Sequence, residues 1–506
     1  MSRRLPVVAV LLVLAFAYLG SRGIWDPDEG RYTNVAINML ARGDWLIPHR
    51  SLEVAHWTKP PLAYWTIASS LALFGTNTWA ARLTPALAYL ACAWLVGRIA
   101  RRLAPGGERA ATLVFATMLL PAFAAQIVTT DFLLAACETL ALWGYVEFRW
   151  GDGRRGWSLL MWGAFGLAFL AKGPPGLLPL LAVLAVEFAA PGTRRVASIA
   201  GLLVFAGVAL PWFIAVVVRE PSLASYFLAR EVVDRVAGSD LRRHPQWYGW
   251  LLVYVPTLLL GTLPWTFALL RRLPALPARM RGWRDPAVRQ GDSTALLLIA
   301  WIVLPLMVFC VARSRLPLYV LPLMVQLSLL VARQHVAMQR VQSQVLLLGW
   351  VAVLVVSRLA VASLGASQDA RPWADAIRQQ APGRVDEVVF IDAAPRYGLR
   401  LHLGPEVELV ALAVPRAGDT PSEAGPFDEP LASELQEDPR YTVWVAPARE
   451  WPSVSAYLAA RGFDARVSHF RDATLFVIRP KGGPDMAKAR AVGPPAPVFI
   501  ARRSAR

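Results

Sequence analysis

The sequence predicts a multi-span α-helical membrane protein with a small soluble α/β domain near its C-terminal end. Hydrophobic residues make up 56% of the 506 residues, Trp occurs 20 times, and the mean hydropathy is +0.43. This composition is too apolar for a water-soluble chain of ordinary type. After about residue 366 it changes to short β-like runs separated by Pro, Gly and Asp, which indicates a second, soluble domain.

Eleven apolar stretches are predicted to be transmembrane helices, within a range of about 11–13, although several are shorter than the roughly 20 residues that a span usually needs. They cover residues 5–21, 79–97, 110–128, 132–148, 157–171, 174–190, 197–218, 247–270, 293–312, 316–332 and 344–364. The first stretch lacks a cleavage site of small residues, so we interpret it as a retained anchor rather than a signal peptide. Residues 63–75 are short and rich in hydroxyls, which favours a helix that lies at the interface or re-enters the membrane.

The loops between these stretches differ in charge on the two sides of the membrane. Counting from Arg3 and Arg4, alternate loops carry clusters of arginines that all fall on one side, and the positive-inside rule makes that side cytoplasmic. The other side receives ionisable groups from five loops: Asp28, Glu29 and Lys59; Asp131; Lys172; His244 in the 219–246 loop; and Arg315 with Tyr319. A set scattered for structural reasons would not need to share a side. We therefore expect a functional site on that face.

Several function classes are disfavoured by the sequence. The net charge of +17 resides mostly in short interspan loops, where it fixes orientation in the bilayer, so nucleic-acid binding is not expected. The three cysteines each sit inside an apolar run, which gives neither a disulfide framework nor metal-ligand spacing. No HExxH, GxxxxGK[ST], GxSxG or CxxC pattern occurs. The corresponding zinc-peptidase, P-loop, hydrolase and thiol-redox chemistries are therefore disfavoured.

The predicted domains are a membrane domain at 1–365, a soluble α/β domain at 366–480 and a disordered tail at 481–506. Strands are expected at 385–392, 442–446 and 474–478, and a helix at 454–460. By the span count, the soluble domain lies on the same non-cytoplasmic face as the predicted site.

The polar segment 24–60, between two hydrophobic stretches, is the first candidate for an active site. Asp28 and Glu29 stand beside Arg31 at the start of a helical pattern, where they could merely cap the helix or serve as a general base or cation site. Asp131 offers the same two readings, because Thr129 and Thr130 precede it at the start of a span. Both alternatives remain open on the sequence alone.

Lysine is rare in this chain and its placement is informative. Only Lys59, Lys172, Lys481 and Lys488 occur among 52 basic residues, and the two in the membrane domain precede proline-bearing turns, TKPP and AKGPP. A compact ammonium group suits a phosphate, although snorkelling to lipid headgroups would also explain it. Arg315 and Tyr319, in SRLPLY, fit the same phosphate-binding task. His244, beside two arginines, is a weaker candidate.

Taken together, DPDEGRYTNVAINMLARGDWLIPHR, TKPPLAYW, LFGTNTWAARL, LAKGPPGLLP, GTLPW and SRLPLYVLP resemble the bacterial GT-C glycosyltransferases that use polyprenyl-phosphate sugars. The likeness is strongest to lipid A aminoarabinose transferases and their protein O-mannosyltransferase-like relatives, and it spans about residues 24–335 in order. It implies an inverting transfer of a sugar from undecaprenyl phosphate to an envelope acceptor at the periplasmic face of the bacterial inner membrane.

The resemblance also implies roles for individual residues. Asp28 matches the acidic residue proposed as catalytic in this family, Asp131 matches the second acidic position, and Lys59 and Tyr319 match positions associated with the lipid phosphate. The chain departs from the family at Thr58, where aminoarabinose transferases usually carry Glu, and at Arg315, where many relatives carry Lys. The residue at position 58 gives no support to a divalent metal, so the metal and cofactor requirement stays open.

A mechanism follows from the chemistry of such a donor. The departing phosphate is a weak base that Lys59, Lys172 or Arg315 can stabilise, and Asp28, assisted by Asp131, would deprotonate a hydroxyl acceptor. Aminoarabinose onto lipid A is the first expectation, and another sugar, mannose-like or galacturonic acid, onto protein or another glycan is the alternative. A lipid-linked-sugar transporter is a weaker rival, because transporters tend to place charges at the membrane midplane within repeated halves.

Overall fold

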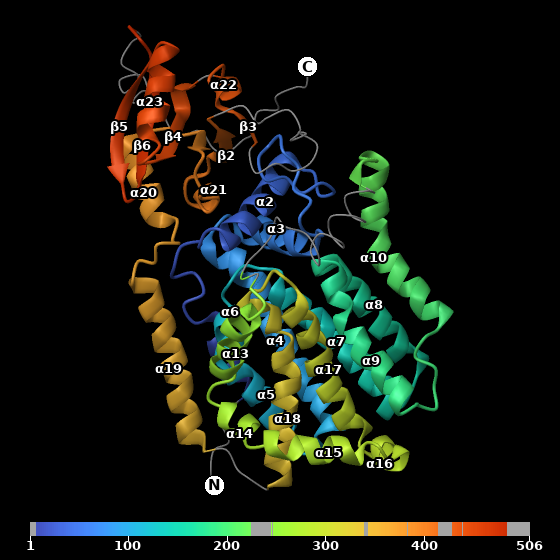
Figure 1. Cartoon of the computed structure of the whole chain (residues 1–506). Coiled ribbons are helices and arrows are strands. Elements are labelled where there is room, and N and C mark those ends of the chain that lie inside the picture. The colour runs from blue at the N-terminus through green and yellow to red at the C-terminus, as the bar shows by residue number, and fades with distance from the viewer. Residues whose placement is uncertain are drawn as a thin grey trace. The chain divides into compact units, whose positions relative to one another are not determined.

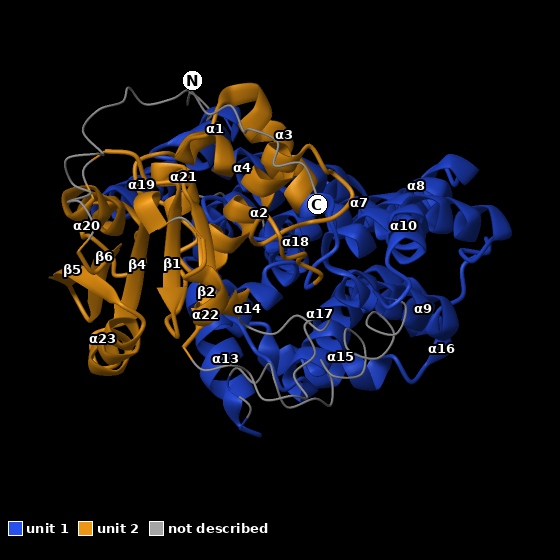
Figure 2. Ribbon diagram, turned by 90° about the horizontal axis from the view of Figure 1, so that it is seen from above, with its two compact units in different colours: residues 1–19, 58–63, 82–360 blue, residues 20–57, 64–81, 361–506 orange. Residues whose placement is uncertain are grey.

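The computed structural model describes residues 7–223, 244, 246–338, 343–381, 383–412, 428–437 and 439–482. The chain divides into two compact units that are coloured separately in Figure 2. Unit 1 comprises residues 1–19, 58–63 and 82–360, and unit 2 comprises residues 20–57, 64–81 and 361–506. The segment that contains Asp28 thus belongs with the C-terminal part of the chain, a grouping that the predicted boundary at residue 365 did not anticipate.

Unit 1 is built from helices (Figure 1). The first of these are α1 (Val7–Phe16), α4 (Thr78–Leu103), α5 (Glu108–Thr117), α6 (Leu119–Ala124), α7 (Asp131–Trp150), α8 (Arg155–Lys172), η1 (Pro174–Leu177), α9 (Leu178–Ala189) and α10 (Ile199–Arg219). After them come α13 (Gly249–Gly261), α14 (Thr266–Leu270), η3 (Leu273–Ala275), α15 (Leu276–Gly282), α16 (Pro286–Gly291), α17 (Ser293–Val311), η4 (Pro317–Val320), α18 (Leu323–Ala337) and α19 (Gln344–Ser363). Each of the eleven predicted spans coincides with one of these apolar helices or with a broken pair of them.

The membrane-spanning character of unit 1 is explicit in its most apolar helices. Among the described residues, four helices are long and apolar enough to cross a membrane alone, namely α4, α10, α17 and α19. A fifth span results if α13 is joined to the segment that follows it across a bend of 109°. Their lipid-facing character shows in exposed apolar side chains such as Val218, 77% exposed, and Val311, 75% exposed. The predicted multi-span membrane fold is confirmed.

The two ends of unit 1 carry different charged residues, as the neighbouring helices α7 and α8 show. Asp131 begins α7 and Lys172 ends α8, so both lie at one end. At the other end, Arg149 in the last turn of α7 pairs with Glu187, and Arg102 at the end of α4 pairs with Glu147. A helix of 20 residues such as α7 is about 30 Å long, which matches the hydrocarbon thickness of a bilayer. We refer to the end with Asp131 and Lys172 as the Lys172 end, and to the end with Arg149 and Arg102 as the arginine-rich end.

Unit 2 contains two N-terminal helices and an α/β domain. The helices are α2 (Asp28–Arg42) and most of α3 (Leu62–Phe74), where the interfacial helix was expected. The domain contains α20 (Arg371–Gln380), β1 (Glu387–Ile391), α21 (Leu399–Leu403), β2 (Glu406–Ala411), β3 (Glu429–Pro430), α22 (Leu431–Glu434), η5 (Pro439–Tyr441), β4 (Thr442–Pro447), α23 (Trp451–Ala460), β5 (Phe463–Phe470) and β6 (Ala473–Pro480). The three predicted strands and the predicted helix correspond to β1, β4, β6 and α23.

The strands form one sheet with the order β3-β2-β1-β4-β6-β5. The pairs among β1, β2, β3 and β4 are parallel, and β6 runs antiparallel to both β4 and β5. Alternate residues of each strand fill two cores, as the pleat requires. Val388 and Phe390 pack with α20 and α21 on one face, while Val389 and Ile391 pack with α22 and α23 on the other. The domain is thus a sheet with helices on both faces, as predicted.

Candidate functional site

The Lys172 end of unit 1 holds a buried charge pair beside an aromatic ring. The ammonium group of Lys172 forms an ion pair with Asp131 Oδ1, and its Nζ lies 4.3 Å from the centroid of the Tyr319 ring. The side chains of Lys172 and Asp131 are 8% and 10% exposed. Three residues that were expected on one membrane face, from three predicted loops, therefore lie close to one another.

The side chain of Asp131 contacts Lys172, and Thr130, not Asp131, occupies the N-cap position of α7. Thr130 occupies the N-cap of α7 and makes no side-chain capping hydrogen bond. The carboxylate of Asp131 is instead directed to Lys172, while the Asp131 backbone N–H donates to Thr129 Oγ1 at 3.3 Å. Asp131 is therefore the charge partner of a buried lysine.

A second carboxylate, which the sequence analysis did not single out, lies close to this pair. Glu138 is 5% exposed and interacts electrostatically with Lys172 and Asp131. It follows Asp131 by seven residues on α7, which places both residues on one face of the helix. That spacing, inside an otherwise apolar run, was the sequence signal for its proximity.

Arg315 lies between α17 and η4, and its guanidinium binds backbone carbonyls. Nη1 donates to the carbonyl oxygens of His244 at 2.6 Å and Gln246 at 2.9 Å, and Nη2 donates to that of Cys310 at 2.8 Å. Arg315 thus fastens the end of the 219–246 loop to the C-terminal turn of α17. His244 takes part through its backbone, and most of its loop, residues 224–243 and 245, lies outside the described residues.

In unit 2, the two adjacent carboxylates at the start of α2 have different environments. Glu29 is 2% exposed and accepts hydrogen bonds from Arg22 Nη1 at 2.5 Å, Arg22 Nη2 at 2.9 Å and the Trp25 backbone N–H at 3.0 Å. Asp28 is 38% exposed and pairs with Arg31 at 2.5 Å. Asp28 therefore presents an accessible carboxylate, whereas Glu29 is held within the fold by Arg22, a residue that sequence reasoning missed.

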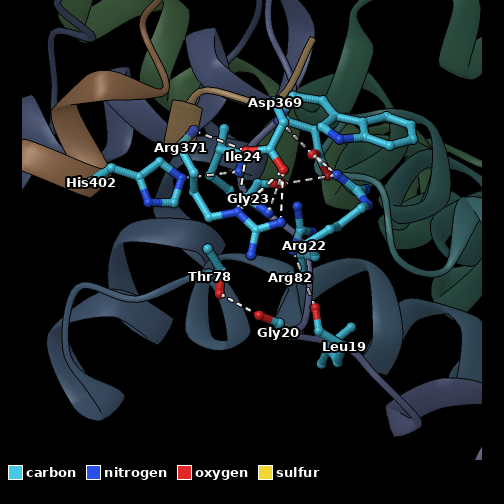
Figure 3. Close-up of polar contacts among 12 residues, drawn as sticks. Leu19, Gly20, Arg22, Gly23, Ile24, Thr78, Arg82, Asp369, Arg371 and His402 are labelled. Atoms are coloured by element: carbon cyan, nitrogen blue, oxygen red, sulfur yellow. Dashed lines mark hydrogen bonds and ion pairs between the residues drawn. The ribbon is translucent and has the colours of Figure 1, made fainter. Parts of the chain in front are cut away.

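The segment before α2 is attached to the α/β domain by backbone and side-chain hydrogen bonds. Figure 3 shows the Asp369 carboxylate between the Gly23 N–H, which donates at 3.1 Å, and the Arg371 guanidinium, whose Nη2 donates at 2.8 Å. In the same view the Ile24 N–H donates to His402 Nε2 at 3.1 Å. Asp26 Oδ1 accepts the Gly398 N–H at 2.9 Å. The fold of the α/β domain thus positions the helix that carries Asp28.

Two of these acidic side chains have shifted pKa values. Burial raises the pKa of Asp26 from 3.8 to about 7, against the hydrogen bond from Gly398 and the charge of Arg396, which lower it. Burial alone would also raise the pKa of Asp369, but its hydrogen bonds and ion pair with Arg371 lower it below 3.8. Asp26 is thus the group in this attachment whose charge changes near neutral pH.

The remaining predicted residues are distributed between the units. Lys59 and Thr58 lie in unit 1, half-buried, just before α3, and Arg31 lies on α2 in unit 2. Unit 1 therefore contains six of the predicted residues: Lys59, Asp131, Lys172, His244, Arg315 and Tyr319. Unit 2 contains Asp28, Glu29 and Arg31.

One group of carboxylates, within the part of the chain that the structure describes, has metal-ligand spacing. Oxygens of Glu387, Glu408 and Glu434 in the α/β domain all lie within 4.8 Å of one another. Burial is the main cause that raises their pKa values, to about 7, about 10 and about 11 respectively, and neighbouring carboxylates add to it. Protonated carboxyl groups can hydrogen-bond to one another, which accounts for the cluster without an ion.

Residues 58–218 match the family model described as dolichyl-phosphate-mannose-protein mannosyltransferase. The chain is 31% identical over 408 residues to the undecaprenyl phosphate-alpha-4-amino-4-deoxy-L-arabinose arabinosyl transferase of Pseudomonas aeruginosa, which covers 78% of the chain and 70% of that protein. It is 33% identical over 336 residues to the enzyme of the same name from Edwardsiella ictaluri, covering 64% of the chain. The chain spans 58% of the length of the Edwardsiella protein.

Solved structures show the same fold. The crystal structure of ArnT from Cupriavidus metallidurans bound to undecaprenyl phosphate superposes with a TM-score of 0.74 and 23% sequence identity, over 95% of this chain and 98% of that chain. The superposition covers both units, which extends the likeness beyond the 58–218 region that the family model matches.

Proposed function

Since the chain belongs to the family of undecaprenyl phosphate-aminoarabinose arabinosyl transferases, we propose that it transfers a sugar from an undecaprenyl-phosphate-linked donor to an envelope acceptor. The reaction takes place at the periplasmic face of the bacterial inner membrane. The donor sugar is 4-amino-4-deoxy-L-arabinose, as in the names of the relatives, and the acceptor is lipid A.

The observation that carries this proposal is the buried Lys172, held between Asp131 and the Tyr319 ring at the Lys172 end of unit 1. A lysine shielded from water in this way keeps a fixed position, and its ammonium group is available to an anion that replaces Asp131 as its partner. A lipid phosphate brings such an anion to a membrane edge. Lys59, in the same unit, is the second cation for this phosphate.

The chemical step requires stabilisation of the departing phosphate. As the bond between the sugar and the phosphate breaks, negative charge grows on the leaving oxygen. A preorganised ammonium group near that oxygen lowers the barrier, because the surrounding apolar side chains strengthen the electrostatic interaction. Lys172 supplies this stabilisation: Asp131 is its partner before the phosphate binds, and the Tyr319 ring lies beside its ammonium group. Arg315 acts indirectly, through the carbonyl groups that it binds.

Asp28 has the role of general base or acceptor-positioning group. It is the carboxylate of the pair that remains accessible, since Glu29 is committed to Arg22 and Trp25. With a hydroxyl acceptor it takes the proton of the attacking oxygen, and with a phosphate acceptor it positions the attacking group. Arg31, paired with Asp28, orients its carboxylate.

A different sugar is the second candidate, and Thr58 is the residue that favours it. Aminoarabinose transferases usually carry Glu at the position before Lys-Pro, and a hydroxyl replaces that charge here. A carboxylate can pair with the amino group of aminoarabinose, whereas a threonine hydroxyl offers only a neutral hydrogen bond. A neutral or acidic sugar then fits the site, with protein or another glycan as an alternative acceptor.

Mass spectrometry of envelope glycolipids and proteins tests the proposal. Cells that supply the donor would express the chain, its Asp28→Asn variant and an Asp375→Asn control at matched levels; Asp375 is an exposed carboxylate, 65% exposed, in an i,i+3 pair. We expect a mass gain of one aminoarabinose on lipid A with the unaltered chain and the control, and none with Asp28→Asn.

The other outcomes are equally informative. If lipid A is unchanged and another molecule gains mass, the chain is still a transferase, but the proposed sugar or acceptor is wrong. No gain on any molecule would contradict the transferase proposal and favour a transporter of lipid-linked sugar. A gain that persists in Asp28→Asn would remove Asp28 from its proposed role.

A further inference from the structure

A second candidate binding site lies at the opposite, arginine-rich end of unit 1. It is centred on the break between α13 and α14, where the chain reads GTLPW at 261–265 and turns by 109°. Trp265 Nε1 donates to Thr117 Oγ1 at 3.0 Å, and Trp350 Nε1 of α19 donates to the Thr117 carbonyl at 2.8 Å. The first hydrogen bond attaches the break to Thr117, the last residue of α5, and the second attaches α19 to the same residue.

A small cavity opens beside this break. It has a volume of about 140 Å³ and is lined by Trp265, Phe267, Ala268, Arg271, Gln334 and His335. His335 Nδ1 donates to the Val331 carbonyl at 2.9 Å, which leaves Nε2 as its other polar atom, and the imidazole packs edge-on against Trp265 at 5.7 Å. The cavity therefore has a rigid aromatic wall, side-chain donors from Arg271 and Gln334, and the Nε2 atom of His335.

The arginines of this region fall into two groups. Residues 266–291 contain six arginines and a single acidic residue, Asp285. Arg279 pairs with Asp292, and Arg289 donates to the carbonyls of Ala189 and Trp283. The side chains of Arg271, Arg272, Arg281 and Arg284 have no recorded partner within the described ranges and are exposed. Four guanidinium groups are thus presented outward from a short stretch of chain.

Apolar side chains are exposed beside these cations. Phe267 is 68% exposed, Leu270 41%, Leu273 52% and Met280 58%. At the start of α19, Val345 and Leu346 are 79% and 76% exposed. Adjacent exposed cations and large apolar groups suit the boundary between lipid headgroups and acyl chains, where both are satisfied at once.

We propose that this cavity is a binding site for the phosphate headgroup of an anionic phospholipid of the cytoplasmic leaflet. Arg271, His335 and Gln334 contact the phosphate, and the exposed side chains of α14 and the start of α19 contact the acyl chains. The site is distinct from the Lys172 end, because the two lie at opposite ends of α18. Tyr319 stands just before the helix begins, and His335 lies in its last turn. The site anchors the broken segment 262–291 to the bilayer surface.

Native mass spectrometry of the full chain in a neutral detergent tests this site. Phosphatidylglycerol and phosphatidylcholine are added separately, and we expect the protein to retain phosphatidylglycerol about fivefold more strongly. Arg271→Gln/His335→Gln should abolish that preference. Arg281→Gln is the matched control, because Arg281 is an exposed arginine of the same segment outside the cavity, and it should keep most of the preference.

Further arms separate the remaining explanations. Arg271→Gln alone, at an exposed position, guards against misfolding of the double variant, and it should weaken phosphatidylglycerol retention. Addition of millimolar inorganic phosphate should leave lipid retention unchanged; displacement of the lipid by phosphate would identify a free-phosphate site and overturn the proposal. An equal loss in Arg281→Gln, or no loss in Arg271→Gln, would mean that the whole basic surface and not the cavity attracts the lipid, which would also overturn it.

Discussion

The Asp26 carboxylate accepts a hydrogen bond from the backbone N–H of Gly398 at 2.9 Å, across 372 positions of sequence. This contact joins the segment before α2 to the α/β domain within unit 2. Its partner oxygen, Oδ2, is buried with no hydrogen-bond partner among the described residues. The carboxyl group that positions the Asp28 helix is therefore the one that ionises near neutral pH.

We expect Asp26→Asn to change the pH dependence of stability. Folded Asp26 holds its proton up to about pH 7, whereas its unfolded value is 3.8. Its contribution to stability is thus full below about pH 4 and falls between about pH 4 and 7, by on the order of 1 kcal/mol per pH unit, after which it stays constant. Asparagine can still accept the Gly398 N–H and does not ionise.

Thermal unfolding in detergent between pH 5 and 8.5 would measure this effect. The difference in Tm between Asp26→Asn and the unaltered chain should grow in favour of the variant as the pH rises. Parallel pH profiles for the two proteins would show that Asp26 is not the titrating group. Asp375→Asn, at an exposed position, serves as the control.

Gly30→Ala should destabilise the protein even though alanine is the better helix former. A Cβ at Gly30 would lie 1.8 Å from Asp26 Oδ1 and 2.7 Å from the Gly398 backbone nitrogen, which cannot move independently of the chain. We expect a loss of about 1–3 kcal/mol from overpacking. Gly156→Ala on α8 is the matched control, since a Cβ there meets nothing within 4 Å, and it should be neutral or stabilising. Equal Tm values for the two variants would contradict the close packing at Gly30.

The adjacent acids of α2 should respond differently to substitution. Glu29→Gln leaves Arg22 buried without its charge partner, at a cost of about 3–5 kcal/mol, and activity should fall because less protein folds. Asp28→Asn removes an accessible carboxylate and should lower the turnover rate with little change in Tm. Measuring Tm and turnover on the same preparations separates the two. A large stability loss in Asp28→Asn would instead give that residue a structural role.

The Lys172–Asp131 pair allows a double-variant test. Lys172→Met and Asp131→Asn each leave one buried charge without its partner and should destabilise the protein. The double variant Lys172→Met/Asp131→Asn removes both charges and should recover part of that stability. It should nevertheless lose about 10²–10³ in rate, because the leaving phosphate no longer meets the Lys172 ammonium group. Recovery of activity together with stability would make the pair purely structural.

Much of this architecture follows from sequence patterns. Apolar stretches located the helices of unit 1, and counting spans brought Asp131, Lys172 and Tyr319 to one end. Alternating and continuous apolar runs located β1, β4 and β6. β2 was missed because Glu406 and Glu408 interrupt its apolar run, and β5 because it is an edge strand with polar, exposed residues.

Long-range polar pairing could not be predicted in this way. Arg22 and Glu29 are separated by seven residues, but their pairing depends on the turn before α2, which no period describes. The contacts of Asp26 with Gly398 and of Gly23 with Asp369 join segments more than 340 positions apart. Both contacts lie within unit 2, which is assembled from three separate segments of the chain. Such contacts are set by tertiary structure, so a single sequence contains no local signal for them.

The most direct test of the proposed function uses purified protein with undecaprenyl-phosphate-linked aminoarabinose and lipid A. The account predicts that free undecaprenyl phosphate and sugar-modified lipid A appear in equal amounts. It also predicts that Lys172→Met/Asp131→Asn, compared at equal amounts of folded protein, forms both products at least about 100-fold more slowly. Modification at an unchanged rate by that variant, or release of undecaprenyl phosphate without modified lipid A, would contradict the account.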